Sequence, residues 1–289
     1  DYIAISFPRS AEDMNYAKQL IAEAGGKAGV IAKIERAEAI PVIDEIINAS
    51  DAVMVARGDL GVEIGDSELP AVQKHIIWRA RVLDKPVITA TQMMETMIHN
   101  TIPTRAEVFD VANAVIDNTD AVMLSAETAT GDHPHLVVKA MSDVCLGAEK
   151  QAITKTSGHR VECEFDRNDE AIAMAAVYVA NHVKCIKAIV ALTETGATPL
   201  WMSRIRTATP IFALSGRVDT QRKVCLYRDV YPFAFDMNQY QIHEVNKAAT
   251  EYLKAQGVLA EGDWVLITKG DVGAAGRTNT LKIYQVGSQ

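Results

Sequence analysis

Short runs of β-branched and small apolar residues alternate with longer amphipathic stretches through the first 150 residues. The runs typical of strands are 1–7, 30–34, 52–56, 87–91 and 121–125, and the helix candidates are 10–24, 38–48, 67–83, 104–116 and 134–149. Strands that alternate with helices in this way pair in parallel through right-handed crossovers. Because the strands are apolar on both faces, we expect them to be buried on both sides, as in a barrel or a doubly wound sheet.

Polar side chains follow the strands in a pattern that favours the barrel. Four strands end in pairs of functional residue types: Lys33 and Glu35, Arg57 and Asp59, Thr91 and Gln92, and Ser125 and Glu127. In a (β/α)8 barrel the carboxyl ends of the strands meet at one mouth, where catalytic groups come from several strands. Five βα units are present and eight are needed, so residues 1–150 are expected to be the last five units of a barrel whose first three strands precede residue 1.

A second α/β pattern follows a polar stretch at 150–167, which is a plausible linker. The expected strands are 185–193, 210–215, 230–235, 263–268 and 281–286, and the expected helices are 168–182, 197–207, 218–226 and 239–256. This pattern predicts a smaller α/β domain at 151–289 with a mainly parallel sheet.

Composition argues against several classes of function. The net charge of −8 makes a broad affinity for nucleic acid or an anionic membrane unexpected. No apolar run approaches the roughly 18 residues that a membrane span needs. The four cysteines form no CxxC pair, which is typical of free thiols in a reducing cytosol, so we expect a cytoplasmic protein.

The residues after the second and third strands have both a structural and a functional interpretation. Lys33 and Glu35 are two positions apart in a strand and so point to the same side. They could form a structural ion pair or belong to a functional site, and this motif alone favours neither interpretation. The RGDLG segment at 57–61 could be only a tight turn, because glycine and aspartate favour turns.

Two carboxylates at neighbouring strand ends suit a hard divalent cation better than a turn does. Mg²⁺ typically takes one or two protein carboxylates and completes its octahedron with water and substrate oxygens. Glu35 and Asp59 fit this role, and Lys33 would add a fixed positive charge beside the ion. Such a site suits an anionic, oxygen-rich substrate such as a keto acid, an enolate or a phosphate.

Thr91, Ser125 and Glu127 would bring two hydroxyl groups and a carboxylate to the same mouth. Each also has a simpler interpretation, because threonine and serine commonly cap the helix that follows a strand, and Glu127 could be an acidic residue of a first helical turn. Their combined placement is more telling than any one of them.

Several long motifs resemble pyruvate kinase, in order along essentially the whole chain. They are AKIERAEA (32–39), MVARGDLGVEIG (54–65), VITATQMMETM (87–97), TRAEVFDVANAVIDNTDAVMLSAETATG (104–131) and GRTNTLKIYQV (276–286). The chain resembles the C-terminal three-fifths of the bacterial form, with barrel strands four to eight and the regulatory domain. The resemblance implies phosphoryl transfer from phosphoenolpyruvate to ADP, giving pyruvate and ATP, in an allosteric homotetramer.

The resemblance also implies roles for individual residues. Glu35 and Asp59 would ligate Mg²⁺ or Mn²⁺, and Lys33 would stabilise the transferring phosphoryl group and the enolate. The N–H groups of Gly58 and Asp59 would hold the substrate carboxylate, and Thr91 would contact the substrate near the carbon that becomes the methyl group.

In the same family Ser125 and Glu127 would belong to the network that delivers the proton. The K⁺ ligands, a substrate-binding arginine and the lid domain are expected upstream of residue 1, so the chain by itself is expected to be inactive.

The loop between 192 and 204 is the candidate effector site. Thr193, Thr195, Gly196 and Thr198 lie between a strand and a helix, and a helix N-terminus can bind an anion. The resemblance places an effector phosphate here and a second loop, 269–280, over its sugar. A sugar phosphate or a nucleotide monophosphate is the expected effector, whereas a simple βα turn with capping hydroxyls is the alternative.

Two rival functions stay open at this point. A magnesium-dependent aldolase or lyase that forms an enolate of pyruvate would explain residues 30–61 but not the last 120 residues. A regulatory or assembly module without catalytic activity would explain the fold, although the presence of Lys33, Glu35, Asp59 and Thr91 speaks against it.

Overall fold

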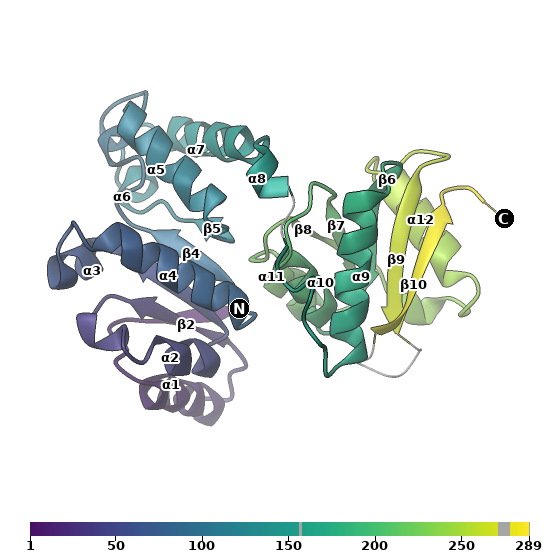
Figure 1. Cartoon of the computed structure of the whole chain (residues 1–289), viewed down its shortest axis with the longest axis horizontal. Coiled ribbons are helices and arrows are strands. Elements are labelled where there is room, and N and C mark those ends of the chain that lie inside the picture. The colour runs from purple at the N-terminus through teal and green to yellow at the C-terminus, as the bar shows by residue number, and fades with distance from the viewer. Residues whose placement is uncertain (156–157, 271–277, 289) are drawn as a thin grey trace. The chain divides into compact units, whose positions relative to one another are not determined.

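A computed structural model describes residues 1–155, 158–270 and 278–288 of the chain. It divides into two compact units, Asp1–Thr154 and Lys155–Gln289 (Figure 1). Each unit has its own sheet and its own hydrophobic core, and each is described by itself below.

The first unit is built on a five-stranded parallel sheet. Its strands run in sequence order: β1 (Tyr2–Ile5), β2 (Gly29–Ile34), β3 (Ala52–Ala56), β4 (Val87–Ala90) and β5 (Ala121–Val122). Neighbouring strands are in register at their carboxyl ends, where Ile5 pairs with Ala32 and Lys33 with Met54. The strand ends therefore lie along one edge of the sheet, which is the arrangement of the last five units of a (β/α)8 barrel.

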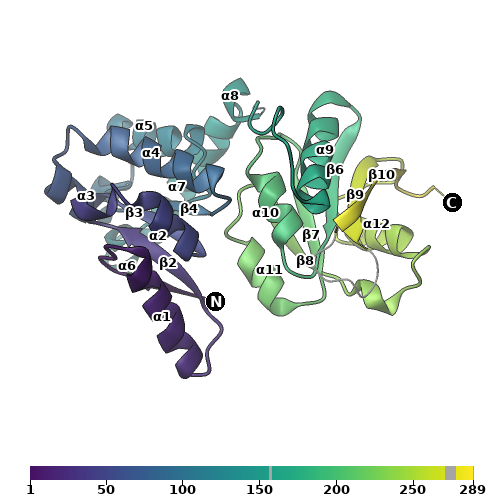
Figure 2. The same ribbon diagram turned by 60° about the horizontal axis from the view of Figure 1, so that its bottom comes forward.

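Helices connect these strands and cover the sheet (Figures 1 and 2). They are α1 (Ala11–Glu23), α2 (Ile43–Ala49), α3 (Arg57–Ile64), α4 (Leu69–Val82), α5 (Arg105–Ile116), α6 (Ala126–Ala129), α7 (Pro134–Glu149) and α8 (Ala152–Lys155), with short 3₁₀ turns η1 (Ala37–Ala39) and η2 (Glu95–Ile98). The apolar faces of α1, α2, α3 and α4 pack on the buried residues of β2 and β3, among them Val30, Ile34 and Val55, whereas α5 and α7 contribute to a separate cluster.

The structure differs from the sequence-based expectation at three places in this unit. The strand expected at 121–125 is only Ala121–Val122, and the helix expected at 38–48 is split into η1 and α2. Pro41 lies at this break: it has no N–H with which to continue a helix past Ile40, and the next residue, Val42, leaves the helical conformation with a φ of −113° and a ψ of 22°. The segment at 57–61, for which a tight turn was one interpretation, is the first part of α3.

The second unit has a mixed five-stranded sheet in the order β10-β9-β6-β7-β8. Its strands are β6 (Ile186–Leu192), β7 (Ile211–Ser215), β8 (Val230–Ala234), β9 (Trp264–Gly270) and β10 (Thr278–Gln285). Only β10 is antiparallel to its neighbour among the described pairs, so the sheet is mainly parallel, as expected.

Helices cover both faces of this second sheet (Figure 2). One layer contains α9 (Asn168–His182), α10 (Ala197–Ser203) and α11 (Val218–Val224), and the other contains α12 (Val245–Ala255), which follows the short turn η3 (Met237–Gln239). A separate hydrophobic cluster fills each layer. None of the helices in the described ranges is both long enough and apolar enough to cross a membrane.

A capping box, whose sequence signature is the spacing of Thr104 and Glu107, fixes the start of α5. Thr104 Oγ1 accepts the N–H of Glu107, and the Glu107 carboxylate accepts the N–H of Thr104 at 2.7 Å. The same carboxylate accepts the N–H and the hydroxyl of Thr96 at 2.7 and 2.6 Å. Burial raises the pKa of Glu107, but the hydrogen bonds from Thr96 and Thr104 outweigh it and hold the pKa below its ordinary value.

We expect Glu107→Ala to lower the free energy of unfolding by about 1–2 kcal/mol, because it removes a helix cap and the link to η2. Urea denaturation followed by circular dichroism measures the change. Glu95→Ala is the matched control, since Glu95 is an exposed residue of η2 itself and should change stability little. Equal losses in the two variants would contradict the role given to Glu107.

Candidate active site

Lys33 and Glu35, at the end of β2, form an ion pair on one side of the strand. Lys33 Nζ lies 2.5 Å from Glu35 Oε1 and donates a hydrogen bond to Ser6 Oγ at 3.1 Å. The side chain of Glu35 is fully buried, whereas that of Lys33 is 27% exposed. The ammonium group therefore lies between a buried carboxylate and the solvent side of the strand ends.

The end of β1 holds the other oxygen of Glu35. The N–H of Phe7 donates to Glu35 Oε2 at 2.7 Å, and Phe7 has a φ of 55°, in the left-handed region that few residues other than glycine adopt. Glu35 is thus held from two sides, by an ammonium group and by a backbone N–H. Its Oε1 is the oxygen in contact with the Lys33 ammonium group and has no further partner among the described residues, so a remaining lone pair of this oxygen could bind a cation.

Asp59 is the second carboxylate of the expected pair, and its surroundings differ from those of Glu35. It is exposed in the first turn of α3, where an acidic side chain is favoured by the helix dipole. The carboxylate of Asp59 has no hydrogen-bond or ion-pair partner within the described part of the chain. Asp59 is therefore free to turn toward a ligand, whereas Glu35 is fixed by the fold.

The start of α3 is tied to the end of β4. The N–H of Gly58 donates to Thr91 Oγ1 at 2.8 Å, and the Thr91 hydroxyl is 2.7 Å from the carbonyl of Ala90, which accepts its proton. The N–H of Asp59 belongs to the first turn of the helix and has no intrahelical acceptor. Of the two N–H groups expected to hold a substrate carboxylate, that of Gly58 is already bonded to Thr91.

The segment after β4 has an unusual backbone. Thr91, Gln92 and Met94 all have positive φ values, 66°, 55° and 57°. Such conformations cost about 1–3 kcal/mol each and persist only where surrounding contacts hold them. Met93, Met94 and Met97 are completely buried beneath this segment, so the strained backbone is anchored on a methionine-rich core.

Arg57 is a further anchor for this segment, and its contacts were not expected from the sequence. Its side chain is 7% exposed and ion-pairs with Asp110 of α5 at 2.6 Å. Its guanidinium also donates to the carbonyl of Ala90 at 3.3 Å and to that of Thr91 at 2.6 and 3.2 Å.

Ser125 and Glu127 lie together at the start of α6. Glu127 is buried, and its Oε2 accepts the N–H of Ser125 at 2.6 Å. This contact is what a first-turn acid would make, so the local interpretation of Glu127 has direct support. Lys33 with Glu35, Gly58 with Thr91, and Ser125 with Glu127 lie at the ends of successive strands, but no hydrogen bond or ion pair between described residues joins the three groups to one another.

The candidate effector loop is closed by its own hydroxyl groups. Thr193 Oγ1 accepts the N–H of Gly196 at 3.0 Å, and Thr195 Oγ1 that of Ala197 at 3.4 Å. Thr193 and Thr198 are buried, and Thr198 Oγ1 lies 2.6 Å from Thr278 Oγ1, whereas Thr195 is exposed. Residues 271–277 of the second expected loop lie outside the described residues.

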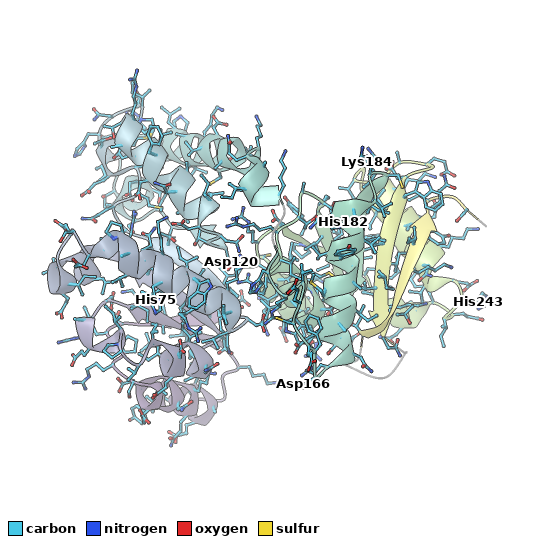
Figure 3. All side chains as sticks on the ribbon, in the orientation of Figure 1. His75, Asp120, Asp166, His182, Lys184 and His243 are labelled. Carbon is cyan, nitrogen blue, oxygen red and sulfur yellow. The ribbon has the colours of Figure 1, made fainter. Side chains whose placement is uncertain are left out.

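Histidine and cysteine give no sign of a metal centre. The histidines labelled in Figure 3 lie on separate elements: His75 on α4, His182 at the end of α9 and His243 just before α12. In residues 1–155, 158–270 and 278–288, no group of three or more His, Cys, Asp or Glu side chains could hold a metal ion. A metal site at the barrel mouth would therefore draw on two carboxylates and need ligand oxygens from outside the chain.

Comparison with known protein families gives two matches. Residues 1–138 match the model of the pyruvate kinase barrel domain, and residues 170–284 match that of the pyruvate kinase α/β domain. The chain is 54% identical over 290 residues to pyruvate kinase II of Salmonella typhimurium and 53% identical to a pyruvate kinase of Buchnera aphidicola. Each alignment covers 99% of the chain, which spans 60% of the length of these relatives.

A solved structure has the same fold. The crystal structure of a pyruvate kinase from Cryptosporidium parvum superposes with a TM-score of 0.88 at 36% sequence identity. The match covers 99% of the chain and 58% of that structure. The likeness thus extends over both units and over both of the sheets described above.

We expect Gly196→Ala to destabilise the candidate effector loop by about 1–2 kcal/mol, because Gly196 has a φ of +79° and an added Cβ would lie 2.9 Å from Val224. Thermal unfolding measures the effect. Gly147→Ala in α7 is the control: a Cβ there meets nothing within 4 Å, and alanine favours a helix, so stability should rise slightly. A neutral Gly196→Ala would show that the loop does not need this conformation.

Proposed function

Because the chain belongs to the pyruvate kinase family, we propose that the protein containing it transfers the phosphoryl group of phosphoenolpyruvate to ADP and so forms pyruvate and ATP. The observation that carries the proposal is the buried Glu35 carboxylate paired with Lys33, next along the strand ends to the unpartnered Asp59. This reaction is the final step of glycolysis, and the transferase and kinase classes follow from it.

The donor set at the strand ends fits Mg²⁺ or Mn²⁺. The Glu35 carboxylate has lone pairs beyond those used by Lys33 and Phe7, and the Asp59 carboxylate has no partner among the described residues. Hard oxygen donors of this kind are what these ions prefer. A divalent ion bound there would neutralise the charge of the transferring phosphoryl group and of the enolate oxygen. The Lys33 ammonium group contacts Oε1 of Glu35, so Lys33 and the ion would share this carboxylate through different lone pairs.

The chain's own residues would act mainly by position and charge, which is what phosphoryl transfer requires of a protein. Lys33 would place its ammonium group on the phosphoryl oxygens and on the developing enolate. The N–H groups of Gly58 and Asp59 would bind the substrate carboxylate, as helix N-termini bind anions. Thr91, already bonded to Gly58, would contact the substrate near the carbon that becomes the methyl group.

Ser125 and Glu127 would take part in protonation of the enolate. The Ser125 hydroxyl makes no hydrogen bond to another described residue and so can bind water, and Glu127 holds the Ser125 backbone in place through its N–H. Glu127 would then act through Ser125, because its own carboxylate is buried.

The two parts of the chain would have different tasks. Residues 1–150 would form the C-terminal part of the catalytic barrel, and residues 151–289 the regulatory domain. Thr193, Thr195, Gly196 and Thr198 would bind the phosphate of a sugar phosphate or of a nucleotide effector. The homotetramer, the K⁺ requirement and the absence of nucleic-acid and membrane partners stay predictions, as does the cytoplasmic location, which the four free cysteines support.

The rival functions have less support. A magnesium-dependent aldolase or lyase accounts for the segment from 30 to 61, but both matched families are pyruvate kinase domains and together they extend to residue 284. A module without activity would not need the buried ion pair of Lys33 and Glu35 close in the chain to Asp59, whose carboxylate has no partner among the described residues.

We expect Lys33→Ala to lower phosphoryl transfer by at least about 10²-fold, because it removes the charge that faces the transferring group. The assay follows pyruvate formation through lactate dehydrogenase with phosphoenolpyruvate, ADP and Mg²⁺, and circular dichroism checks the fold. Lys139→Ala is the control, since Lys139 pairs with Asp143 on the exposed face of α7 and should leave the rate unchanged. Near-normal turnover by Lys33→Ala would refute its assigned role.

We expect Thr195→Glu to abolish activation by sugar phosphates and nucleotide monophosphates, because the new carboxylate would repel a bound phosphate. Thr195 is better suited to this test than Thr198, since Thr198 is buried and a charge there would also break its contact with Thr278. Thr195→Ser keeps the hydroxyl group and should keep the activation. An activation curve that Thr195→Glu leaves unchanged would count against this site.

A further inference from the structure

We propose that Arg57 is a positioning residue of the barrel mouth: it holds the peptide of Thr91 in place and so sets the position of the Thr91 hydroxyl and the Gly58 N–H. The inference deepens the proposed function and rests on it for its kinetic test. It also has a test that needs no activity, given below.

Two consecutive residues of α3 bind Thr91 from different sides. The Arg57 guanidinium donates to the Thr91 carbonyl through Nη2 at 2.6 Å and through Nε at 3.2 Å. The Gly58 N–H donates to the Thr91 hydroxyl oxygen at 2.8 Å. Thr91 is therefore held by its main chain and by its side chain, both to the first turn of one helix.

The conformation of Thr91 needs such support. Thr91 is β-branched and has a φ of 66°, a combination that is a genuine outlier. Its carbonyl follows the last residue of β4 and therefore cannot continue the ladder with β5, which ends at Val122. Arg57 supplies donors for this carbonyl. Without them, fewer contacts would stabilise Thr91 in its left-handed conformation.

Asp110 fixes the guanidinium from its other end. It lies on α5, 53 residues away along the chain, and binds Arg57 Nη1 at 2.6 Å. The planar guanidinium thus reaches a carboxylate through one nitrogen and peptide carbonyls through the other two. A lysine offers its donors from a single atom and cannot span both groups in this way.

The contacts of Arg57 allow a role in the site to be distinguished from a role in folding alone, because they involve residues expected to bind one substrate and not the other. The Arg57 side chain is almost fully buried, and its nitrogens are bonded to Asp110 and to the carbonyls of Ala90 and Thr91, so we expect it to act on the site through Thr91 and the adjacent Gly58. Its loss should therefore impair use of phosphoenolpyruvate, whose carboxylate and methyl-forming carbon lie at these two residues in the proposed function. The binding of ADP should not depend on it.

The decisive variant is Arg57→Lys, which keeps the positive charge but loses the planar guanidinium that binds Asp110 and the Thr91 carbonyl at the same time. We expect kcat/KM for phosphoenolpyruvate to fall by about 10- to 10²-fold, because a small displacement of a positioned group has an effect of this size. The KM for ADP should stay within about twofold, which a general loss of folded protein would not produce. Arg79→Lys is the control, because Arg79 also pairs with an aspartate, binding both oxygens of Asp44 through Nε and Nη2, but none of these contacts involves a site residue.

Hydrogen–deuterium exchange gives the second readout. The Gly58 N–H is protected by the Thr91 hydroxyl, so its exchange should become faster in Arg57→Lys and stay unchanged in Arg79→Lys. If Arg57→Lys does not fold, Asp110→Asn takes its place. That variant keeps the donors to the Thr91 carbonyl and loosens only their anchor, so it should show the same changes at smaller size.

Each outcome decides the inference. Faster exchange at Gly58 with a selective loss for phosphoenolpyruvate supports it. Unchanged Gly58 exchange in the variants overturns it, as does a KM for ADP that changes as much as that for phosphoenolpyruvate. A wild-type full-length protein containing the chain that does not use phosphoenolpyruvate would refute the proposed function, while Gly58 exchange would still show whether Arg57 positions Thr91.

Discussion

A single buried carboxylate constrains how the strand ends of the first unit can be arranged. Glu35 has no exposed side-chain surface, and burying a charge is costly unless it is paired and hydrogen-bonded. Lys33 supplies the opposite charge, and Phe7 supplies a backbone N–H from the neighbouring strand. Lys33 lies on the same strand as Glu35, but the N–H of Phe7 reaches Glu35 only when β1 and β2 pair in the observed register, so the second partner of the buried carboxylate depends on the parallel sheet.

The two carboxylates of the proposed metal site are unequal, and the inequality has a chemical use. Glu35 is held in one orientation by contacts that are present before any ligand arrives, whereas Asp59 is exposed at a helix start and has no partner among the residues that the structure describes. A fixed ligand lowers the entropy cost of binding an ion, and a free one can follow the ion and the substrate as they bind. Lys33 is intermediate between the fixed Glu35 and the free Asp59. Its ammonium group is bonded to Glu35 and Ser6, but its side chain is partly exposed.

Part of this arrangement could be predicted from the sequence, and the physical reason for the rest is plain. The period of two in a strand placed Lys33 and Glu35 on one side, and local spacing revealed the capping box of Thr104 and Glu107. The helix α3 was obscured by Gly58 and Gly61, which have low helix propensity, and Leu60 stabilises the helix through complete burial in the core. The left-handed conformations of Phe7 and Thr91 and the contact of Arg57 with Asp110 depend on residues far apart in sequence, which no local pattern encodes.

At the barrel mouth and at the candidate effector loop, a backbone N–H at the start of a helix needs a hydrogen-bond acceptor. The acceptor comes from a different part of the chain in each case. In the effector loop the N–H of Gly196 is accepted by Thr193, three residues earlier, so a ligand that takes this N–H need disturb only a local turn. At the mouth the N–H of Gly58 is accepted by Thr91, a residue of another strand end whose carbonyl is bound by Arg57. A substrate carboxylate that takes the Gly58 N–H must therefore displace or share the Thr91 hydroxyl, and through Arg57 and Asp110 the change reaches α5. A ligand bound at the mouth would thereby be coupled to the packing of the barrel unit. The candidate effector loop is tied to its own unit by the contact of Thr198 with Thr278 and by the Thr220 hydroxyl, which donates to the carbonyl of Glu194 at 2.7 Å.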